Sequence, residues 1–269
     1  MGNVTRFLTI QNVSKQYGKN GAGFLALSNI TLDIDEHEFV SIVGKSGCGK
    51  TTLLRMIAGL VSCEDGVISL QGHRVEGPAS ERGLVFQEYV LFPWRSVSEN
   101  VAFGLEMKGV PSKQRAELVA HFVSLVGLNG FESAFPSELS GGMRQRVAIA
   151  AVLANDPKVL LMDEPFGALD SQTRSLMQEL LLGIWEKAHK TVLFITHDIE
   201  EALFLADHVY VMTARPGRIK QQIDVDIPRP RTLETLTQPA FVALKRRILG
   251  LMHEEAIKAA TAMPSAVSN

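Results

Sequence analysis

The stretch Gly44–Thr51, GKSGCGKT, decides the fold of this chain, because it matches the pattern GxxxxGK[ST] of a phosphate-binding loop. The segment before it, Glu38–Val43, is rich in β-branched residues and bounded by charge, as a buried strand would be. After it, apolar residues recur at helical spacing from Leu53 to Leu60. The sequence therefore predicts a strand, a glycine turn and a helix, which is the setting that such a loop requires.

The positions of this loop have predicted roles in holding a nucleotide. Glycines allow the positive φ that turns backbone N–H groups toward phosphate oxygens, at the positive end of the following helix. Lys50 is expected to reach the β and γ phosphates, and the Thr51 hydroxyl to bind magnesium. The predicted nucleotide-contacting residues here are Gly44, Lys45, Ser46, Gly47, Cys48, Gly49, Lys50, Thr51 and Thr52.

The composition is that of an ordinary globular protein. Of the 269 residues, 46% are hydrophobic and 21% charged, and the formal net charge is -2. This balance gives no electrostatic case for general nucleic-acid binding. Cys48 and Cys63 form no CxxC pair, which favours a reducing, cytosolic compartment. No apolar stretch approaches about 18 residues and the start lacks a signal-peptide core, so we expect neither a membrane span nor export.

Hydrophobic patterning predicts an α/β fold. Alternation in Phe7–Val13 and Ile30–Ile34 indicates antiparallel strands with one wet face. Further strands are predicted at Gly66–Leu70, Gly83–Gln87, Val159–Asp163, Thr191–Thr196 and Val209–Met212. Because helical patterns separate the later strands, the sheet that contains them should be mostly parallel.

Helical character dominates from Ser96 to about Asn155, with helices expected to open at Ser98, Ser112 and Ser140. This pattern indicates a helical insertion in the α/β core. A later helix is expected over Ser175–Ala188. An amphipathic helix over Phe241–Ala260 should point Arg246 and Arg247 outward.

Further motifs follow the phosphate-binding loop. The stretch Leu139–Arg146, LSGGMRQR, places a serine and two glycines at a helix start, where backbone N–H groups are open to an anion. The strand Val159–Asp163 ends in acid and Glu164-Pro165 follows, and taken alone this acid pair could equally be a helix cap or a solvated surface. Gly167–Asp170 and Thr196–Asp198 complete the set.

In these motifs and their order, the sequence resembles the nucleotide-binding subunit of an ATP-binding-cassette (ABC) transporter. The resemblance runs from about Phe7 to Gly217. It implies a P-loop NTPase fold whose mostly parallel core sheet carries an antiparallel β subdomain and a helical subdomain. The implied ATPase domain covers residues 1–217, with the helical subdomain inserted at about 90–155, and a C-terminal tail covers 218–269.

The resemblance also implies roles in ATP hydrolysis. Asp163 would hold Mg²⁺ through water beside Thr51, and Glu164 would polarise the attacking water as general base. His197 would bind the γ phosphate, and Gln87 would touch both the magnesium and the water. Tyr17 would stack on adenine, although in isolation a half-buried strand-end aromatic is the commoner reading. The implied cofactors are ATP and Mg²⁺.

A second copy of the chain is implied as a partner. In this family the LSGG helix faces the phosphate-binding loop of the other subunit, so Ser140, Gly141 and Gly142 would act in trans. Asp170 belongs to the same predicted nucleotide-contacting set. Met143 departs from the glutamine that is more frequent there, which leaves the serine and glycine backbone unaffected.

The segment Glu88–Val101 carries Leu91, Phe92 and Trp94 among polar neighbours. Composition alone favours a core segment, whereas the resemblance implies the groove that receives a membrane permease. Other motifs, such as the ARPGRI turn, are similar to importers of nitrate, sulfonate, taurine and bicarbonate. This implies a peripheral subunit on the cytoplasmic face of the inner membrane, working indirectly with a periplasmic or extracellular solute-binding protein.

Two other functions stay open at this point. A soluble ABC ATPase could act on nucleic acid or ribosomes, but the single cassette, the short gap between motifs and the acidic balance argue against it. A nucleotide-binding regulator that does not hydrolyse ATP is disfavoured because Glu164 and His197 are both present. A phosphate-loop kinase has no need of LSGGMRQR.

Overall fold

The computed structural model describes residues 6–18 and 23–261. These residues form two compact units, which are described separately below. The first contains the described residues up to Pro78 together with those from Thr191 onward, and the second contains Ala79–Lys190. The stretch Gly18–Gly23, GKNGAG, predicts a flexible turn from its glycines, and it lies mostly outside the described residues.

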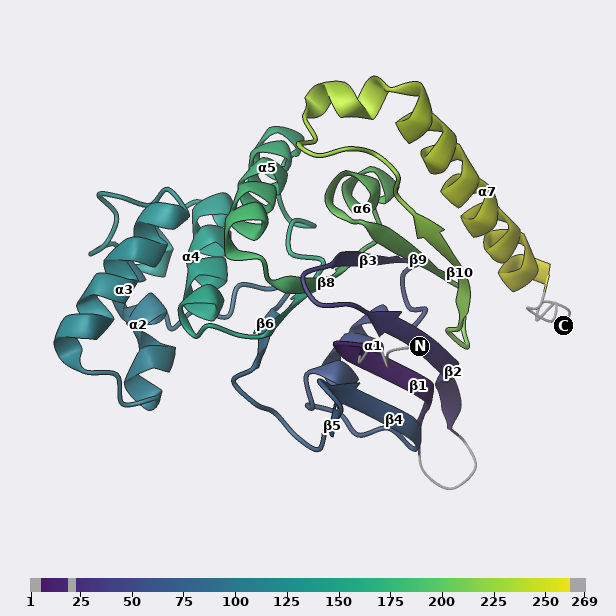
Figure 1. Cartoon of the computed structure of the whole chain (residues 1–269), viewed down its shortest axis with the longest axis horizontal. Coiled ribbons are helices and arrows are strands. Elements are labelled where there is room, and N and C mark those ends of the chain that lie inside the picture. The colour runs from purple at the N-terminus through teal and green to yellow at the C-terminus, as the bar shows by residue number, and fades with distance from the viewer. Residues whose placement is uncertain (1–5, 19–22, 262–269) are drawn as a thin grey trace, which may run out of the picture. The chain divides into compact units, whose positions relative to one another are not determined.

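An antiparallel sheet opens the first unit. Its strands lie in the order β2 (Phe24–Ile34), β1 (Leu8–Tyr17), β4 (Asp65–Leu70) and β5 (His73–Arg74). Figure 1 shows β1, β2 and β4 side by side. Both β1 and β2 are longer than the sequence pattern predicts, because register shifts after Ile10 break the alternation while the pairing continues to Tyr17 and Phe24.

The remaining strands of this unit are arranged about a central strand, β3 (Phe39–Val43). All five residues of β3 are buried. β3 pairs in parallel with β8 (Thr191–Thr196) on one side and with β9 (His208–Met212) on the other. β10 (Ile219–Asp224) pairs antiparallel with β9. The helix α1 (Lys50–Ile57) follows β3, and α6 (Ile199–Leu205) follows β8. The expected mostly parallel arrangement is therefore confirmed here.

The C-terminal segment packs back onto the same unit. A 3₁₀ turn, η2 (Leu233–Thr237), leads to α7 (Pro239–Thr261), which contacts α6 and β9. Phe241 and Ile248 are buried on its inner face, whereas Arg246 and Arg247 are exposed as expected. Among the described residues, no helix is both long enough and apolar enough to span a membrane.

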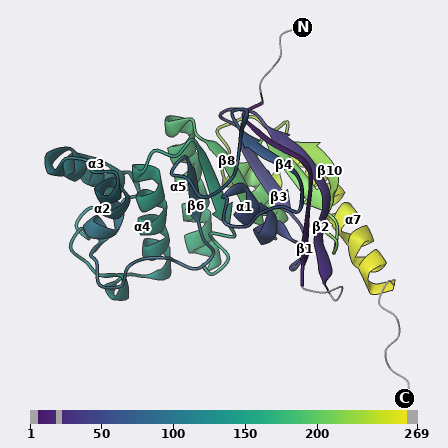
Figure 2. The same cartoon turned by 90° about the horizontal axis from the view of Figure 1, so that it is seen from below.

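The second unit contains the parallel pair β6 (Arg82–Val85) and β7 (Val159–Asp163). Its helices are α2 (Val97–Met107), α3 (Ser112–Leu125), α4 (Gly141–Ala154) and α5 (Ser171–Ala188), with the short η1 (Pro136–Glu138) before α4. Figure 2 shows α2, α3 and α4 as one group, and each of the three contacts the other two. The helical run expected from Ser96 to about Asn155 is therefore confirmed.

Three predicted boundaries in this unit were wrong. The first helix is capped by Ser96 rather than opened by Ser98, because Ser96 and Glu99 form a reciprocal capping box. The strand expected over Gly83–Gln87 ends at Val85. The helix expected from Ser175 begins at Ser171, since the Asp170 side chain caps it by accepting hydrogen bonds from two backbone N–H groups.

Candidate nucleotide-binding site

The phosphate-binding loop joins β3 to α1, as the sequence predicts. Gly47 and Gly49 have φ of +78° and +103°, a conformation that L side chains rarely adopt. A Cβ at Gly44 would lie 2.8 Å from the Cys48 sulfur. The glycines at these positions are therefore required by the backbone conformation and by the close packing of the loop.

The loop curls around the ammonium group of Lys50. This side chain is 4% exposed, and its Nζ donates a hydrogen bond to the Gly44 carbonyl at 2.8 Å. The cap residue of α1, Gly49, has no side chain, and the first turn holds no acidic residue. A positive helix end beside a lysine suits a phosphate group. Thr51 and Thr52, half-buried in the first turn, and the exposed Lys45 and Ser46 complete the predicted set.

His197 lies at the edge of the sheet from which this loop leaves. Val43 and Thr196 are register partners in the parallel pair β3 and β8. The next residues along the two strands are Gly44 and His197, so both emerge at the carboxyl edge, where α/β proteins bind ligands. His197 is exposed. The structure therefore brings the predicted γ-phosphate ligand to the same edge as the phosphate-binding loop.

Tyr17 ends β1 and stands in register with Phe24 of β2. The centroids of the two rings are 5.7 Å apart, and Phe24 is 47% exposed. The Lys15 ammonium lies 5.5 Å from the Tyr17 ring centroid. The half-buried Tyr17 is thus one of a pair of rings at the unit surface, which suits stacking on a base.

The acidic pair lies in the second unit, at the carboxyl end of β7. Asp163 is 6% exposed, and Glu164 has a φ of +43°, in the left-handed region that is costly for a non-glycine residue. Val85 of β6 is the register partner of Met162. Gln87, two residues after Val85, therefore leaves the same edge as Asp163 and is exposed.

The predicted magnesium ligands are a hydroxyl of Thr51, an amide oxygen of Gln87 and a carboxylate of Asp163. Hard oxygen donors of this kind suit Mg²⁺, which commonly keeps several waters and takes only one or two carboxylates. The described residues contain no group of three or more His, Cys, Asp or Glu that could hold a metal ion, and the magnesium ligands named here stay a prediction.

The LSGG segment opens α4 as predicted. The Ser140 side chain caps the helix by accepting a hydrogen bond from the Met143 N–H at 3.3 Å. Its first turn contains no acidic residue. A Cβ at Gly142 would lie 2.7 Å from Thr173, and one at Gly141 would lie 3.4 Å from the Tyr89 hydroxyl. Glycine is therefore needed where this helix start packs most closely.

Asp170 caps α5 by accepting hydrogen bonds from the N–H groups of Thr173 and Gln172 at 3.0 and 3.1 Å. The bonds from Thr173, reinforced by Gln172, hold the pKa of the Asp170 carboxyl below its usual value. Its carboxylate thus stays charged and directed at the helix start. The structure assigns it a local capping role, and its contact with nucleotide stays a prediction.

A pocket of about 490 Å³ opens in the second unit beside the segment predicted to dock a permease. Leu91 and Phe92 line it, together with Phe103 and Met107 of α2. Trp94 does not line the pocket, but its ring lies 5.6 Å from that of Phe92 and is 71% exposed. An exposure this high is incompatible with a core position for Trp94.

Three residues that shape these sites were not predicted from the sequence. Asn100 holds the loop beside the pocket, Arg215 contacts the phosphate-binding loop, and Arg231 is buried at the end of α6. The ENV and ARPGR motifs contain the first two, but nothing local in them shows which carbonyl groups they meet.

Comparison with known proteins places the chain among relatives of similar length. The ABC transporter family model matches residues 27–167. An uncharacterized ABC transporter ATP-binding protein of Methanocaldococcus jannaschii is 51% identical over 251 residues, 93% of each chain. The taurine import ATP-binding protein TauB of Rhizobium johnstonii is 52% identical, covering 85% of this chain and 89% of that protein. The nitrate import ATP-binding protein NrtD of Synechocystis is 48% identical, covering 87% and 90%.

A solved structure shows the same fold. The ATP-binding cassette MJ0796, a dimer in a post-hydrolysis state with ADP and phosphate, superimposes with a TM-score of 0.73. It is 32% identical, and the match covers 82% of this chain and all of that one. The α/β fold of a P-loop nucleotide hydrolase is thereby confirmed, with ATP and Mg²⁺ as cofactors. The chain belongs to the ABC transporter family and is an ATP-binding, ATP-hydrolysing subunit.

Proposed function

We propose that this chain energises a membrane importer for a small oxyanion, of the sulfonate, taurine or nitrate kind. The observation that carries the proposal is the near-full-length similarity, at about half identity, to import proteins named for taurine and nitrate. A further relative, the aliphatic sulfonates import ATP-binding protein SsuB of Bacillus cereus, is 44% identical over 242 residues. The oxyanion class rests on these names, since the transported solute does not touch an ATP-binding subunit.

In the proposed reaction, the loop N–H groups and Lys50 bind the β and γ phosphates, and Tyr17 stacks on the base. Thr51, Gln87 and Asp163 offer oxygen ligands to Mg²⁺, which neutralises phosphate charge when bound. Glu164 accepts the proton of the attacking water, and His197 donates a hydrogen bond to the γ phosphate. The positive φ of Glu164 supports its role, because strained backbone recurs at active sites.

A second ATP-binding subunit completes the proposed site, and ATP closes the two subunits on each other. The exposed Ser140 and the half-buried Gly141 leave the start of α4 open to an incoming phosphate. Asp170 lies at the adjoining helix start and would face the same nucleotide. The dimeric MJ0796 cassette supports this arrangement for the family.

The test compares wild type with Glu164→Gln for ATP hydrolysis, with and without magnesium, across a range of protein concentrations. We expect hydrolysis that needs magnesium, rises more than linearly with concentration and falls at least about a hundredfold in the variant. Glu179→Gln, an exposed position on α5, is the matched control and should hydrolyse normally. Light scattering of Glu164→Gln with ATP should show a dimer; a monomer at every concentration would contradict ATP-driven closure.

The pocket beside Leu91 and Phe92 is the proposed docking site for the permease. Its apolar lining and the exposed Trp94 suit a short helix that presents apolar side chains. Trp94→Ala should weaken binding to permease-containing membranes and leave ATP affinity and the melting temperature unchanged. Phe131→Ala, which removes another exposed aromatic from the same unit, is the control. A circular-dichroism melt that drops in Trp94→Ala would instead favour a packing role.

These interactions would hold the chain at the cytoplasmic face of the inner membrane, with a periplasmic or extracellular solute-binding protein acting indirectly. A regulator that binds ATP without hydrolysing it is the alternative, and repeating the hydrolysis assay with the permease present detects it. If wild type binds ATP but hydrolyses none with the permease present, that alternative replaces the transport proposal. Action on nucleic acid gains no support from a net charge of -2.

A further inference from the structure

The turn between β9 and β10, Thr213–Arg218, packs directly on the phosphate-binding loop. We call it the β9–β10 turn. A Cβ at Gly217 would lie 2.1 Å from the Cys48 carbonyl oxygen, and one at Gly44 would lie 3.1 Å from the Cβ of Met212. Because backbone meets backbone here, a shift of the turn cannot be absorbed by a side chain. The position of the turn therefore limits the conformation of the loop.

Hydrogen bonds on both sides hold the β9–β10 turn in its conformation. The Thr213 hydroxyl donates to the Pro216 carbonyl and accepts from the Arg218 N–H, both at 3.0 Å. On its other side, the Gly217 N–H donates to the Ala26 carbonyl and the Gly217 carbonyl accepts from the Ser28 N–H, both at 2.9 Å. The β9–β10 turn is thereby fastened to β2, the strand that also carries Phe24.

Arg215 connects the two halves of the predicted nucleotide site. One Nη of its guanidinium donates to the Gly47 carbonyl at 3.2 Å. The centre of the same guanidinium lies 4.6 Å from the centroid of the Phe24 ring, which is the partner of Tyr17. A planar cation can stack on a ring and donate in its own plane at once, which an ammonium group cannot do.

The contact with Gly47 orients a peptide of the phosphate-binding loop. The C=O and N–H of a trans peptide point in opposite directions. Holding the Gly47 C=O on Arg215 therefore fixes the Cys48 N–H on the opposite side of the peptide, where it donates to the Lys45 carbonyl at 3.2 Å and closes the turn of the loop. The hydrogen bond is exposed, so its contribution to global stability should be small and its effect local.

We propose that Arg215 is a nucleotide-positioning residue that couples the Tyr17 and Phe24 rings to the phosphate-binding loop. The inference rests on the proposed nucleotide-binding role of Tyr17 and adds a residue that acts through both ends of the site. Base stacking at the rings and phosphate binding at the loop then depend on one guanidinium. Removing it should weaken a ligand that uses both ends more than a ligand that uses only the loop.

The test measures the affinities of the full chain for Mg-ATP and for magnesium tripolyphosphate, which has no base, by calorimetry. Arg215→Ala should weaken ATP binding about three- to tenfold, the scale of one cation–π contact and one hydrogen bond, and tripolyphosphate binding by less. Phe24→Ala and Arg215→Ala should be less than additive for ATP when combined. Arg218→Ala, an exposed arginine of the same turn, is the control and should bind like wild type.

Equal ATP affinity in Arg215→Ala, Arg218→Ala and wild type would overturn the inference. Lys50→Ala separates this failure from failure of the nucleotide site itself, since it should abolish binding whatever Arg215 does. If Arg215→Ala also lowers the melting temperature, Arg215→Lys decides the matter. If Arg215→Lys restores the melting temperature while its ATP affinity stays reduced, the planar guanidinium positions the nucleotide. If the melting temperature and the ATP affinity are restored together, Arg215 is purely structural.

Discussion

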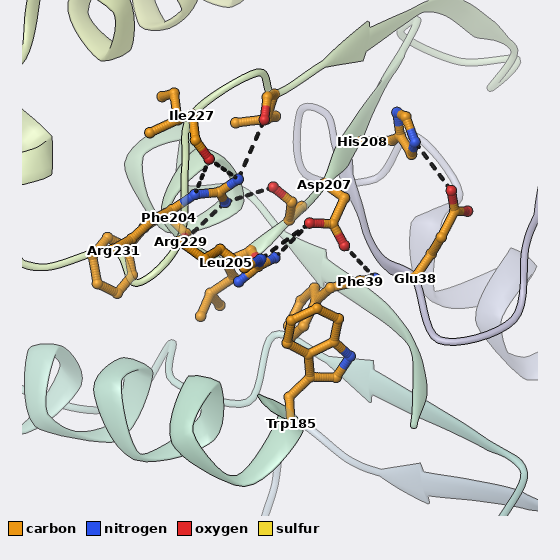
Figure 3. A network of polar contacts seen from close by, with 12 residues as sticks. Glu38, Phe39, Trp185, Phe204, Leu205, Asp207, His208, Ile227, Arg229 and Arg231 are labelled. Atoms are coloured by element: carbon orange, nitrogen blue, oxygen red, sulfur yellow. Dashed lines mark hydrogen bonds and ion pairs between the residues drawn. The ribbon is translucent and has the colours of Figure 1, made fainter. Parts of the chain in front are cut away.

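The Arg231 guanidinium donates a hydrogen bond at 2.6 Å to the carbonyl of Ala206, the residue that caps the C-terminal end of α6. Figure 3 shows this group among backbone carbonyls, and its further acceptors belong to Leu203, Phe204, Val225 and Ile227. Burial, followed by the nearby charge of Arg229, lowers the pKa of Arg231 to about 10, so the group stays charged at neutral pH. A buried cation thus joins the C-terminal segment to the negative end of the helix that follows His197.

Replacing Arg231 should destabilise the first unit strongly. Arg231→Met keeps much of the volume but leaves several buried carbonyls without this donor, so we expect a loss of about 3 kcal/mol in the free energy of unfolding. Urea denaturation measures the change. Arg247→Met removes an exposed arginine from α7 and should stay within about 0.5 kcal/mol. Equal stability of the two variants would show that Arg231 is dispensable.

Asn100 should prove essential to the shape of the loop beside the proposed docking pocket. Its amide nitrogen donates to the carbonyls of Phe92, Arg95 and Ser96, and its oxygen accepts from the Phe92 N–H at 2.8 Å. Asn100→Asp puts a carboxylate oxygen against those carbonyls, and we expect a loss of about 3 kcal/mol.

Hydrogen exchange should then be faster across residues 92–96 than elsewhere in the second unit. The control is Asn129→Asp, because Asn129 is exposed and its amide donates to the hydroxyl of Ser124, itself an exposed residue. Unchanged exchange in the 92–96 loop would mean that the apolar packing of Phe92 alone fixes its shape.

Gly217 should tolerate no side chain. Alanine there would place its Cβ 2.1 Å from the Cys48 carbonyl oxygen, and relieving the overlap should cost about 1–3 kcal/mol. Part of this cost should appear as weaker ATP binding, measured by calorimetry, because the displaced backbone is the phosphate-binding loop. Gly250→Ala on α7 meets nothing within 4 Å and should instead stabilise the chain by about 0.5–1 kcal/mol.

Tyr210 should make the stability pH-dependent above pH 10. Burial, followed by the charge of Glu38, raises the pKa of Tyr210 to about 12. Because the folded pKa exceeds the unfolded value of about 10, the stabilisation is complete below pH 10 and is lost as the pH rises to 12. Two pKa units correspond to about 3 kcal/mol.

Tyr210→Phe removes both the ionisable group and its hydrogen bond to the Asp33 carbonyl at 3.0 Å. The difference in unfolding free energy between wild type and this variant should therefore shrink, or change sign, between pH 10 and 12. A constant difference over that range would contradict the raised pKa of the buried phenol.

The sequence determined much of the local structure. The motif Gly44–Thr51 predicted a strand, loop and helix because its glycines and apolar flanks act within a few residues of each other. The start of α4 at Ser140 was predicted for the same reason. Local signals failed where long-range pairing competes: β1 runs on to Tyr17 through register shifts because β2 continues to pair with it, and no pattern in β1 alone reveals that.

The residue types expected in the site could also be named from sequence, because phosphate, magnesium and water each require particular donors and acceptors. Only the tertiary structure showed what Arg215, Arg231 and Asn100 do. An arginine in a turn looks like a solvated surface residue until the carbonyl that it meets, 168 residues away in the case of Gly47, is brought beside it. Local sequence signals report interactions between residues that are close along the chain. Partners such as Gly47 and Arg215 are instead determined by how the strands pack, which is decided only when the whole unit folds.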